Sequence, residues 1–73
     1  MDGVEMIAVS SSNVAEIGYS ESEQTVYVRY NNGSMYIYKN VPEMDFNGLL
    51  NATSIGSYLH RNFKNVYPYE RIE

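Results

Sequence analysis

The sequence predicts one α+β domain: an antiparallel β-meander of three to four strands, followed by two short α-helices packed on one face of the sheet. Three observations carry this prediction. Up to about residue 39, the apolar residues fall in short, β-branched segments, and after Pro42 they recur about every fourth residue. An Asn-Gly pair separates the two most strand-like segments. With 73 residues, the chain has room for a single domain, residues 1–73.

Four segments of the first half are predicted to be strands. Residues 5–9 and 15–19 are short and rich in β-branched residues, and the segment SSSN between them favours a turn. Residues 25–30, TVYVRY, give the strongest strand signal, because Val, Tyr and Thr fill nearly every position. Residues 34–39, SMYIYK, are the partner of this strand across the Asn-Gly turn.

The length of that turn decides where the tyrosines lie, since a shift of one residue sends every side chain to the other face. A two-residue turn at Asn32-Gly33 places Tyr36 and Tyr38 on an exposed aromatic platform that could stack bases. A three-residue loop, residues 31–33, turns both tyrosines into a buried wall. That wall comprises Val26, Val28, Tyr30, Tyr36 and Tyr38. Both turns need the positive φ that Gly33 tolerates, so the residue types alone do not decide between the two-residue turn and the three-residue loop.

The first helix is predicted to be short and amphipathic. Pro42 suits the first turn of a helix, where a missing N–H costs nothing. Phe46, Leu49 and Leu50 then fall on one face of a helix that runs to about Ala52.

The second helix is predicted to follow at once, with Thr53 or Ser54 placed to cap it. At 100° per residue, one apolar stripe comprises Ile55, Tyr58, Leu59, Phe63 and Val66. Pro68 stops the helix, and the apolar residues around it are available to attach the tail to the body of the domain. These are Tyr67, Tyr69 and Ile72.

The opposite side of the second helix carries Ser57, His60, Arg61 and Lys64, and so holds three of the six residues in the chain that can be cationic. Cations near a helix C-terminus are placed to meet phosphates, although the helix dipole alone also favours them there by about 0.3–1 kcal/mol each. Free N–H groups at the start of the helix could hold a phosphate, although Ser54 also suits an ordinary cap. The candidate ligand-binding residues are Ser54, Gly56, Tyr58, His60, Arg61 and Lys64.

Composition argues against an enzyme and against several kinds of site. There is no cysteine, the single histidine has no carboxylate at helical spacing on its own face, and the acidic residues show no metal-ligand spacing. We therefore expect no catalytic residue, metal or cofactor. The missing signal peptide and membrane span predict a cytoplasmic protein without a membrane partner. The net charge of −4 opposes nonspecific attraction to a polyanion, so binding of nucleic acid needs a local basic patch.

Several short motifs together resemble the KTSC domain, a family named for its place at the C-terminus of some lysyl-tRNA synthetases and also found as stand-alone proteins. The resemblance extends from about Val9 to Ile72. Its parts are SSSN, Ile17-Gly18-Tyr19, the Asn-Gly hairpin, Tyr36 and Tyr38, Val41-Pro42, Ser54-x-Gly56-x-Tyr58 and Tyr67-x-Tyr69. In this family a polar residue often separates the two tyrosines, which implies that they face inward and favours the three-residue turn. Here that residue is Ile37.

The resemblance and the basic helix face together suggest a non-enzymatic module that binds RNA or a nucleotide, with the cations on phosphate and Tyr58 or the C-terminal tyrosines near a base. The alternative is a protein-interaction or self-assembling module, whose exposed edge of Met35 and Ile37 joins copies into a homo-oligomer. In that form it could act as a phage-type sponge for a signalling nucleotide.

Overall fold

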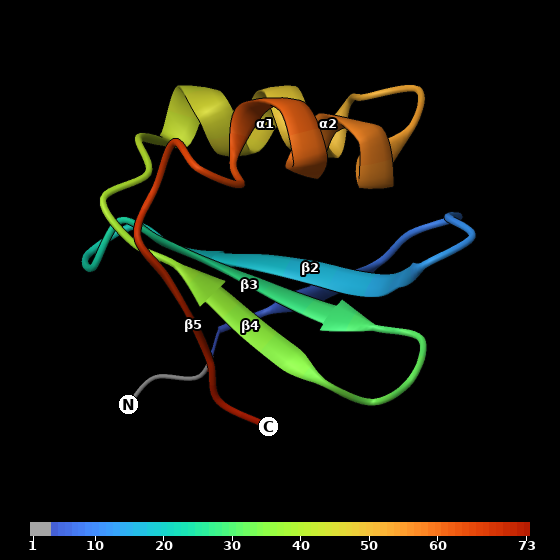
Figure 1. The fold of residues 1–73 in the computed structure, drawn as a ribbon. Coiled ribbons are helices and arrows are strands. Elements are labelled where there is room, and N and C mark those ends of the chain that lie inside the picture. Colours follow the sequence, from blue (N-terminus) through green and yellow to red (C-terminus); the bar gives the residue numbers. More distant parts are fainter. Residues whose placement is uncertain (1–3) are drawn as a thin grey trace.

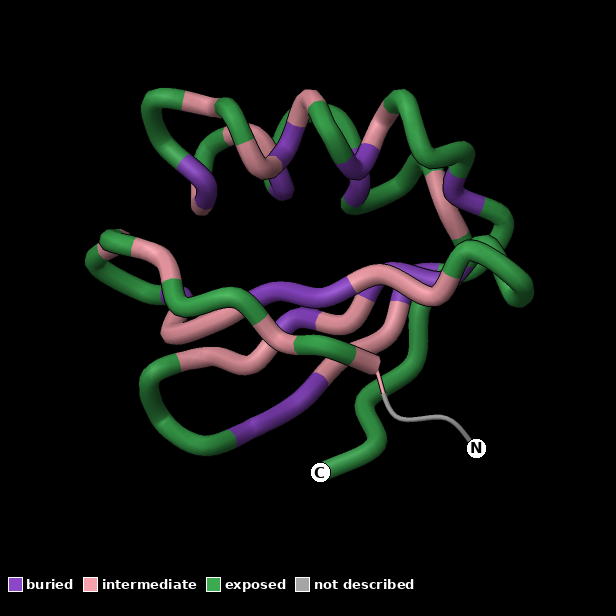
Figure 2. The backbone as a smooth tube through the Cα atoms, turned by 180° about the vertical axis from the view of Figure 1, so that it is seen from behind, coloured by how far each residue is buried: buried purple, intermediate pink, exposed green. Residues whose placement is uncertain are grey.

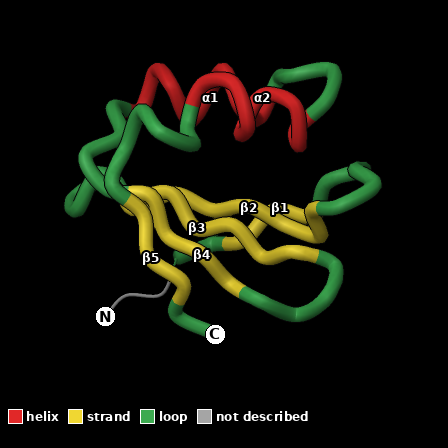
Figure 3. Tube along the Cα trace, viewed as in Figure 1, coloured by secondary structure: helices red, strands yellow, loops and turns green. Residues whose placement is uncertain are grey.

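The computed structural model describes residues 4–73 as an antiparallel five-stranded sheet with both helices on one face (Figure 1); residues 1–3 of the predicted domain lie outside this part. The elements are β1 (Met6–Ala8), β2 (Val14–Ser20), β3 (Thr25–Tyr30), β4 (Met35–Tyr38), α1 (Glu43–Leu50), α2 (Ile55–Asn62) and β5 (Tyr69–Arg71). The strands follow one another in chain order across the sheet (Figure 3). The predicted α+β meander is thus confirmed, with a fifth strand added at its end.

The β3–β4 hairpin has the three-residue loop. The Tyr30 N–H donates to the Ser34 carbonyl at 2.9 Å, and Val28 pairs with Tyr36. Gly33 takes the left-handed conformation at φ 93°, where a side chain would be strained. The Asn32 side-chain oxygen accepts from the Ser34 N–H and hydroxyl, which fixes the loop. Tyr30, Tyr36 and Tyr38 therefore face the helices, as the buried-wall alternative requires.

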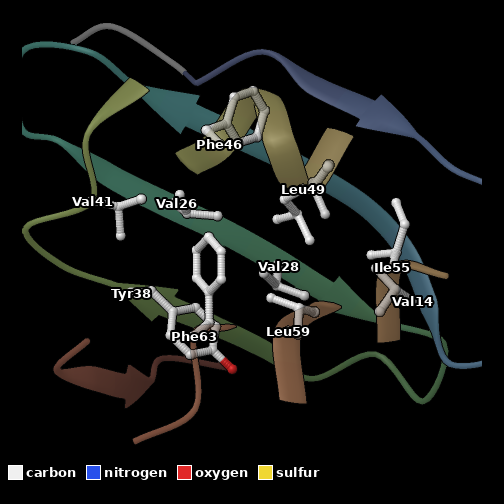
Figure 4. Close-up of a cluster of buried hydrophobic side chains, with 11 residues drawn as sticks. Val14, Val26, Val28, Tyr38, Val41, Phe46, Leu49, Ile55, Leu59 and Phe63 are labelled. Carbon is white, nitrogen blue, oxygen red and sulfur yellow. The ribbon is translucent and has the colours of Figure 1, made fainter. Parts of the chain in front are cut away.

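The core lies between the sheet and the two helices (Figure 4). From the sheet it contains Val14, Ile17, Val26, Val28 and Tyr38, and from the helical half Val41, Phe46, Leu49, Ile55, Leu59 and Phe63. Seen from behind, buried residues occur in the strands as well as in the helical layer (Figure 2). Tyr30 and Tyr36 are only half-buried at the margin of this core. Of the three tyrosines in the predicted wall, Tyr38 is therefore the one that is buried.

The second helix ends earlier than predicted. α2 stops at Asn62, and Phe63 is still fully buried. Asn65 then takes the left-handed conformation at φ 71° and turns the chain back toward the sheet. Because this residue breaks the 100° repeat, Val66 leaves the apolar stripe and is 59% exposed, so its placement on the stripe was wrong. Lys64 likewise lies in the turn after α2 and not in the helix.

The tail attaches to the sheet as a strand, which places β4 in the interior of the sheet. The Lys39 N–H donates to the Pro68 carbonyl at 2.8 Å, and the Ile72 N–H donates to the Met35 carbonyl at 2.8 Å. Met35 is buried and Ile37 half-buried, so the predicted exposed edge of these two residues is wrong. It failed because β5 covers that side of β4. Neither α1 nor α2 is long and apolar enough to cross a bilayer, and the rest of residues 4–73 holds no such helix.

Candidate nucleic-acid interface

Three open hollows adjoin one another along α2, and we call them together the α2 groove. The helix-end hollow, about 480 Å³, and the middle hollow, about 210 Å³, share Asn13, Gly56 and His60. The middle hollow and the tyrosine hollow, about 400 Å³, share Tyr30, Tyr38 and Lys64. The groove therefore connects the start of α2 to the tyrosines of the sheet.

The cations that the sequence placed on one helix face all line this groove. Arg61 borders the helix-end hollow, Lys64 borders the middle and tyrosine hollows, and His60 lies between them. All three side chains are exposed. None of the residues that line the three hollows is acidic, although the whole chain carries nine carboxylates. The groove thus concentrates positive charge on an otherwise acidic protein.

The other basic side chains of the chain form ion pairs or hydrogen bonds with residues of the C-terminal tail. Arg29 pairs with Glu73 at 2.7 Å, and Lys39 pairs with Glu70 at 3.2 Å. The Arg71 side chain donates to the Glu73 carbonyl at 2.9 Å. Within residues 4–73, Arg61 and Lys64 belong to neither of these ion pairs. Their charges are therefore available to an anion in the groove.

Tyrosines form the wall at the other end of the groove. The tyrosine hollow is lined by Tyr30, Tyr36, Tyr38 and Tyr69, together with Asn32, Ser34 and Lys64. Tyr30 meets Tyr36 edge to face, with ring centroids 5.5 Å apart, and Tyr69 lies 6.1 Å from Tyr36 and 5.7 Å from Tyr38. Behind them, Tyr38 packs edge to face on Phe63. The three strands β3, β4 and β5 thus each contribute at least one ring.

Burial raises the pKa of the Tyr38 hydroxyl well above its ordinary value, and the neighbouring Tyr30 hydroxyl, 3.4 Å away, raises it further. At neutral pH Tyr38 therefore presents a neutral hydroxyl to the groove. A neutral wall beside Lys64 leaves the positive charge of the groove uncancelled.

Two loops close the end of the groove near the start of α2. The Asn31 N–H donates to the Asn13 carbonyl at 2.8 Å, and the Asn31 side chain donates to the Ser12 carbonyl at 2.9 Å. Ser11 in turn accepts from the Val14 N–H through its hydroxyl. The predicted SSSN turn is thereby tied to the hairpin loop, and Asn13 is held against the groove.

The remaining candidate residues divide between the groove and the core. The Ser54 hydroxyl accepts from the Ser57 N–H at 3.3 Å, so Ser54 is the N-cap of α2, and it also borders the helix-end hollow with Gly56. Tyr58 points the other way, toward α1. A Cβ at Gly48 would overlap the Tyr58 hydroxyl, so this glycine lets the two helices approach. Tyr58 lines none of the three hollows.

Several residues that line the groove were not among the candidate site residues, although the sequence analysis expected the C-terminal tyrosines, which include Tyr69, to lie near a base. Tyr30, Asn32, Ser34 and Tyr69 reach it because of the hairpin register and the pairing of β5, and Asn13 reaches it through its bond to Asn31. The polar turn residues SSSN and NNG were the available signal for two of these positions. Nothing local marks Tyr69, because its neighbour β4 lies about thirty residues earlier.

These features define the class: a small α+β domain that carries a cationic and aromatic groove beside its second helix. The chain belongs to the KTSC domain family, since the family model of the KTSC domain matches residues 10–67. The match leaves out β1 and β5, so Tyr69 lies beyond it.

Similar proteins agree with this membership. A KTSC domain protein from Yersinia pestis, known from a crystal structure, has the same fold with a TM-score of 0.90 at 25% identity, over 97% of this chain and 100% of its own. An uncharacterised protein of Stutzerimonas stutzeri is 34% identical over 92% of this chain and 96% of its own length. A lysine–tRNA ligase of Trichormus variabilis is 31% identical over 92% of this chain, which corresponds to 12% of the ligase.

Proposed function

We propose that this domain is a non-enzymatic module that binds single-stranded RNA or a nucleotide in the α2 groove. The observation that carries the proposal is the charge of the groove: His60, Arg61 and Lys64 line it, and no carboxylate does. A polyanion is attracted to such a surface even when the net charge of the protein is negative, because a polyanion in the groove experiences the local positive potential there.

The order of the groove fits an extended ligand. Arg61, Lys64 and His60 occupy the side formed by α2 and the turn after it, and the hollows continue past them to the tyrosines. A single strand, whose phosphates repeat along one side and whose bases project from it, matches a groove with cations along one wall. The lysine–tRNA ligase that contains a similar segment acts in a context where RNA is present, which agrees with this choice.

Salt dependence provides the test. Each neutralised phosphate of a single strand contributes about −0.7 to the slope of log K against log salt concentration, so three contacts give a slope near −2. We expect micromolar affinity at low salt, measured by fluorescence anisotropy of a labelled single-stranded RNA. Arg61→Ala and Lys64→Ala should each reduce the slope by about 0.7 and leave the melting temperature nearly unchanged, because both side chains are exposed.

Lys39→Ala is the matched control, because it removes the same charge from a residue paired with Glu70 outside the groove. It should leave the slope unchanged. Absence of RNA binding at low salt contradicts the proposal, and so does equal binding by the Arg61, Lys64 and Lys39 variants. The mass of the protein in solution, measured alongside, identifies the alternative: a stable oligomer indifferent to RNA would indicate a self-assembling module.

A further inference from the structure

Resting on the proposed function, we infer that the tyrosine hollow is a subsite for one unpaired base, with Lys64 holding the adjoining phosphate. The hollow has a volume of about 400 Å³, within the roughly 300–1,000 Å³ of typical small-ligand sites. It opens directly from the part of the groove that the cations line, because Lys64 borders both. A ligand that reaches the tyrosines therefore also meets positive charge.

The rings are available for stacking. Tyr69 is 52% exposed, and Tyr36 is half-buried, while Tyr38 beneath them is anchored on Phe63. The centroids of Tyr36 and Tyr69 are only 6.1 Å apart with the rings inclined by 36°, so no base fits between them. A base instead lies on the ring face of Tyr69 or Tyr36 that borders the hollow, a contact worth about 5-fold to more than 100-fold in affinity for each stacked base.

Polar groups that line the hollow favour a ligand with hydrogen-bonding edges. Asn32 and Ser34 border it, and the Asn32 oxygen is already occupied by the Ser34 N–H and hydroxyl. This arrangement holds the Asn32 amide in one orientation and leaves its NH₂ group to donate to the ligand. A planar ring with acceptor atoms on its edge and a phosphate attached is the chemistry of a nucleotide. A neutral sugar would use the tyrosines but not Lys64.

The test compares two ligands on the unchanged protein: a single-stranded RNA octamer and an abasic octamer with the same ribose-phosphate backbone. At low salt, we expect the RNA to bind at least about 5-fold more tightly, with the same salt slope, because stacking adds affinity without releasing counterions. Equal affinity for the two ligands overturns the base subsite and leaves the proposed function standing. Failure of both ligands to bind overturns the proposed function, and the subsite with it.

Two matched variants locate the stacking ring. Tyr69→Leu removes an exposed ring from the hollow, whereas Tyr27→Leu makes the same change on the opposite face of the sheet, where Tyr27 pairs with Ile37. Tyr69→Leu should weaken RNA binding about 5-fold or more and leave binding of the abasic octamer unchanged, and Tyr27→Leu should change neither. Equal effects of the two variants on RNA binding overturn the assignment of the hollow.

Discussion

At one side of the helix–sheet interface the half-buried Tyr19 packs against α1, while at the other side Tyr38, although only 5% exposed, borders an open groove. The two residues lie in one row across the sheet, since Tyr19 pairs with Val26 and Val26 with Tyr38. Tyr19 stacks on Phe46 of α1, with ring centroids 5.1 Å apart, and its hydroxyl donates to the Val41 carbonyl at 2.6 Å. Tyr38 packs on Phe63, and the hydrogen-bond partner of its hydroxyl among residues 4–73 is the Tyr30 hydroxyl, at 3.4 Å.

The two ends also differ in the charges that surround the tyrosine. Desolvation raises the pKa of Tyr19, and the nearby carboxylates of Glu43 and Glu21 raise it further. Lys64 borders the hollow at the Tyr38 end. Tyrosine therefore has two roles: at the acidic end Tyr19 packs half-buried against the margin of the core, and at the cationic end Tyr38 belongs to the core and also lines the groove.

The largest expected effect comes from removing the ring that both closes the core and supports the groove. Tyr38→Ser should destabilise the fold by about 3–5 kcal/mol, as large aromatic-to-small changes in cores do, because Tyr38 is only 5% exposed. Urea denaturation at neutral pH measures this loss. A loss under about 1 kcal/mol would mean that the ring is a surface platform and that the two ends do not differ as described.

Alkaline unfolding sharpens the comparison next. Because the folded pKa of Tyr38 lies above the unfolded value of about 10, both states keep the proton below pH 10 and the contribution of Tyr38 to stability is fully present there. Above pH 10 the unfolded state loses the proton first. Stability then falls, by at most about 1.4 kcal/mol per pH unit for this tyrosine, until the pH passes the folded pKa.

Tyr38→Phe removes that titration, so its stability should fall less steeply than that of the parent between pH 10 and 11, measured by urea denaturation at each pH. Tyr36→Phe is the control, because Tyr36 is half-buried on the same face of β4. Identical slopes for the parent and Tyr38→Phe would contradict the burial of the hydroxyl.

A smaller effect distinguishes the two hydroxyl groups directly. Tyr19→Phe should cost about 1–2 kcal/mol, because it leaves the Val41 carbonyl without its partner in a half-buried position. Tyr30→Phe, at the open end, should cost less than about 0.5 kcal/mol, since water can replace a long hydroxyl–hydroxyl contact. Equal losses in thermal or urea denaturation would show that the two ends are closed to the same degree.

The smallest effect is expected at the turn after α2. Val66→Ser should change stability by no more than about 0.5 kcal/mol, because its side chain is largely exposed. A loss of about 2 kcal/mol in urea denaturation would return Val66 to the apolar stripe and extend the helix past Asn65.

The sequence predicted the elements well where the signal was local and failed where it depended on distant pairing. Periodicity identified both helices and the four strands before residue 40, although it continued the second helix past its end at Asn62 and so placed Lys64 in the helix. Periodicity could not decide between the two-residue and the three-residue hairpin loop, since Gly33 suits either. The preference for the three-residue loop came from the family resemblance. β5 has three exposed residues and no strand pattern of its own, so only its bonds to β4 reveal it.

The sequence analysis predicted the basic residues and the tyrosines of the candidate site separately. His60, Arg61 and Lys64 follow from helical spacing, and the tyrosines were considered separately as a wall or a platform. Their convergence depends on Asn65, whose left-handed backbone returns the chain to the sheet, and on the inward register of the hairpin. Neither can be read from composition, because asparagine is tolerated in the left-handed region without being required there.

The three-residue loop at 31–33 has a consequence for how such a surface could arise or vanish in evolution. Because strand side chains alternate between faces, deletion of one loop residue would favour the two-residue turn and rotate the whole of β4 by one position. Every tyrosine codon would remain, yet Tyr36 and Tyr38 would point away from α2 and Ile37 would take the inner face. Insertions and deletions in this loop, more than substitutions of the aromatic residues, are therefore the changes by which relatives of this domain could gain or lose the groove.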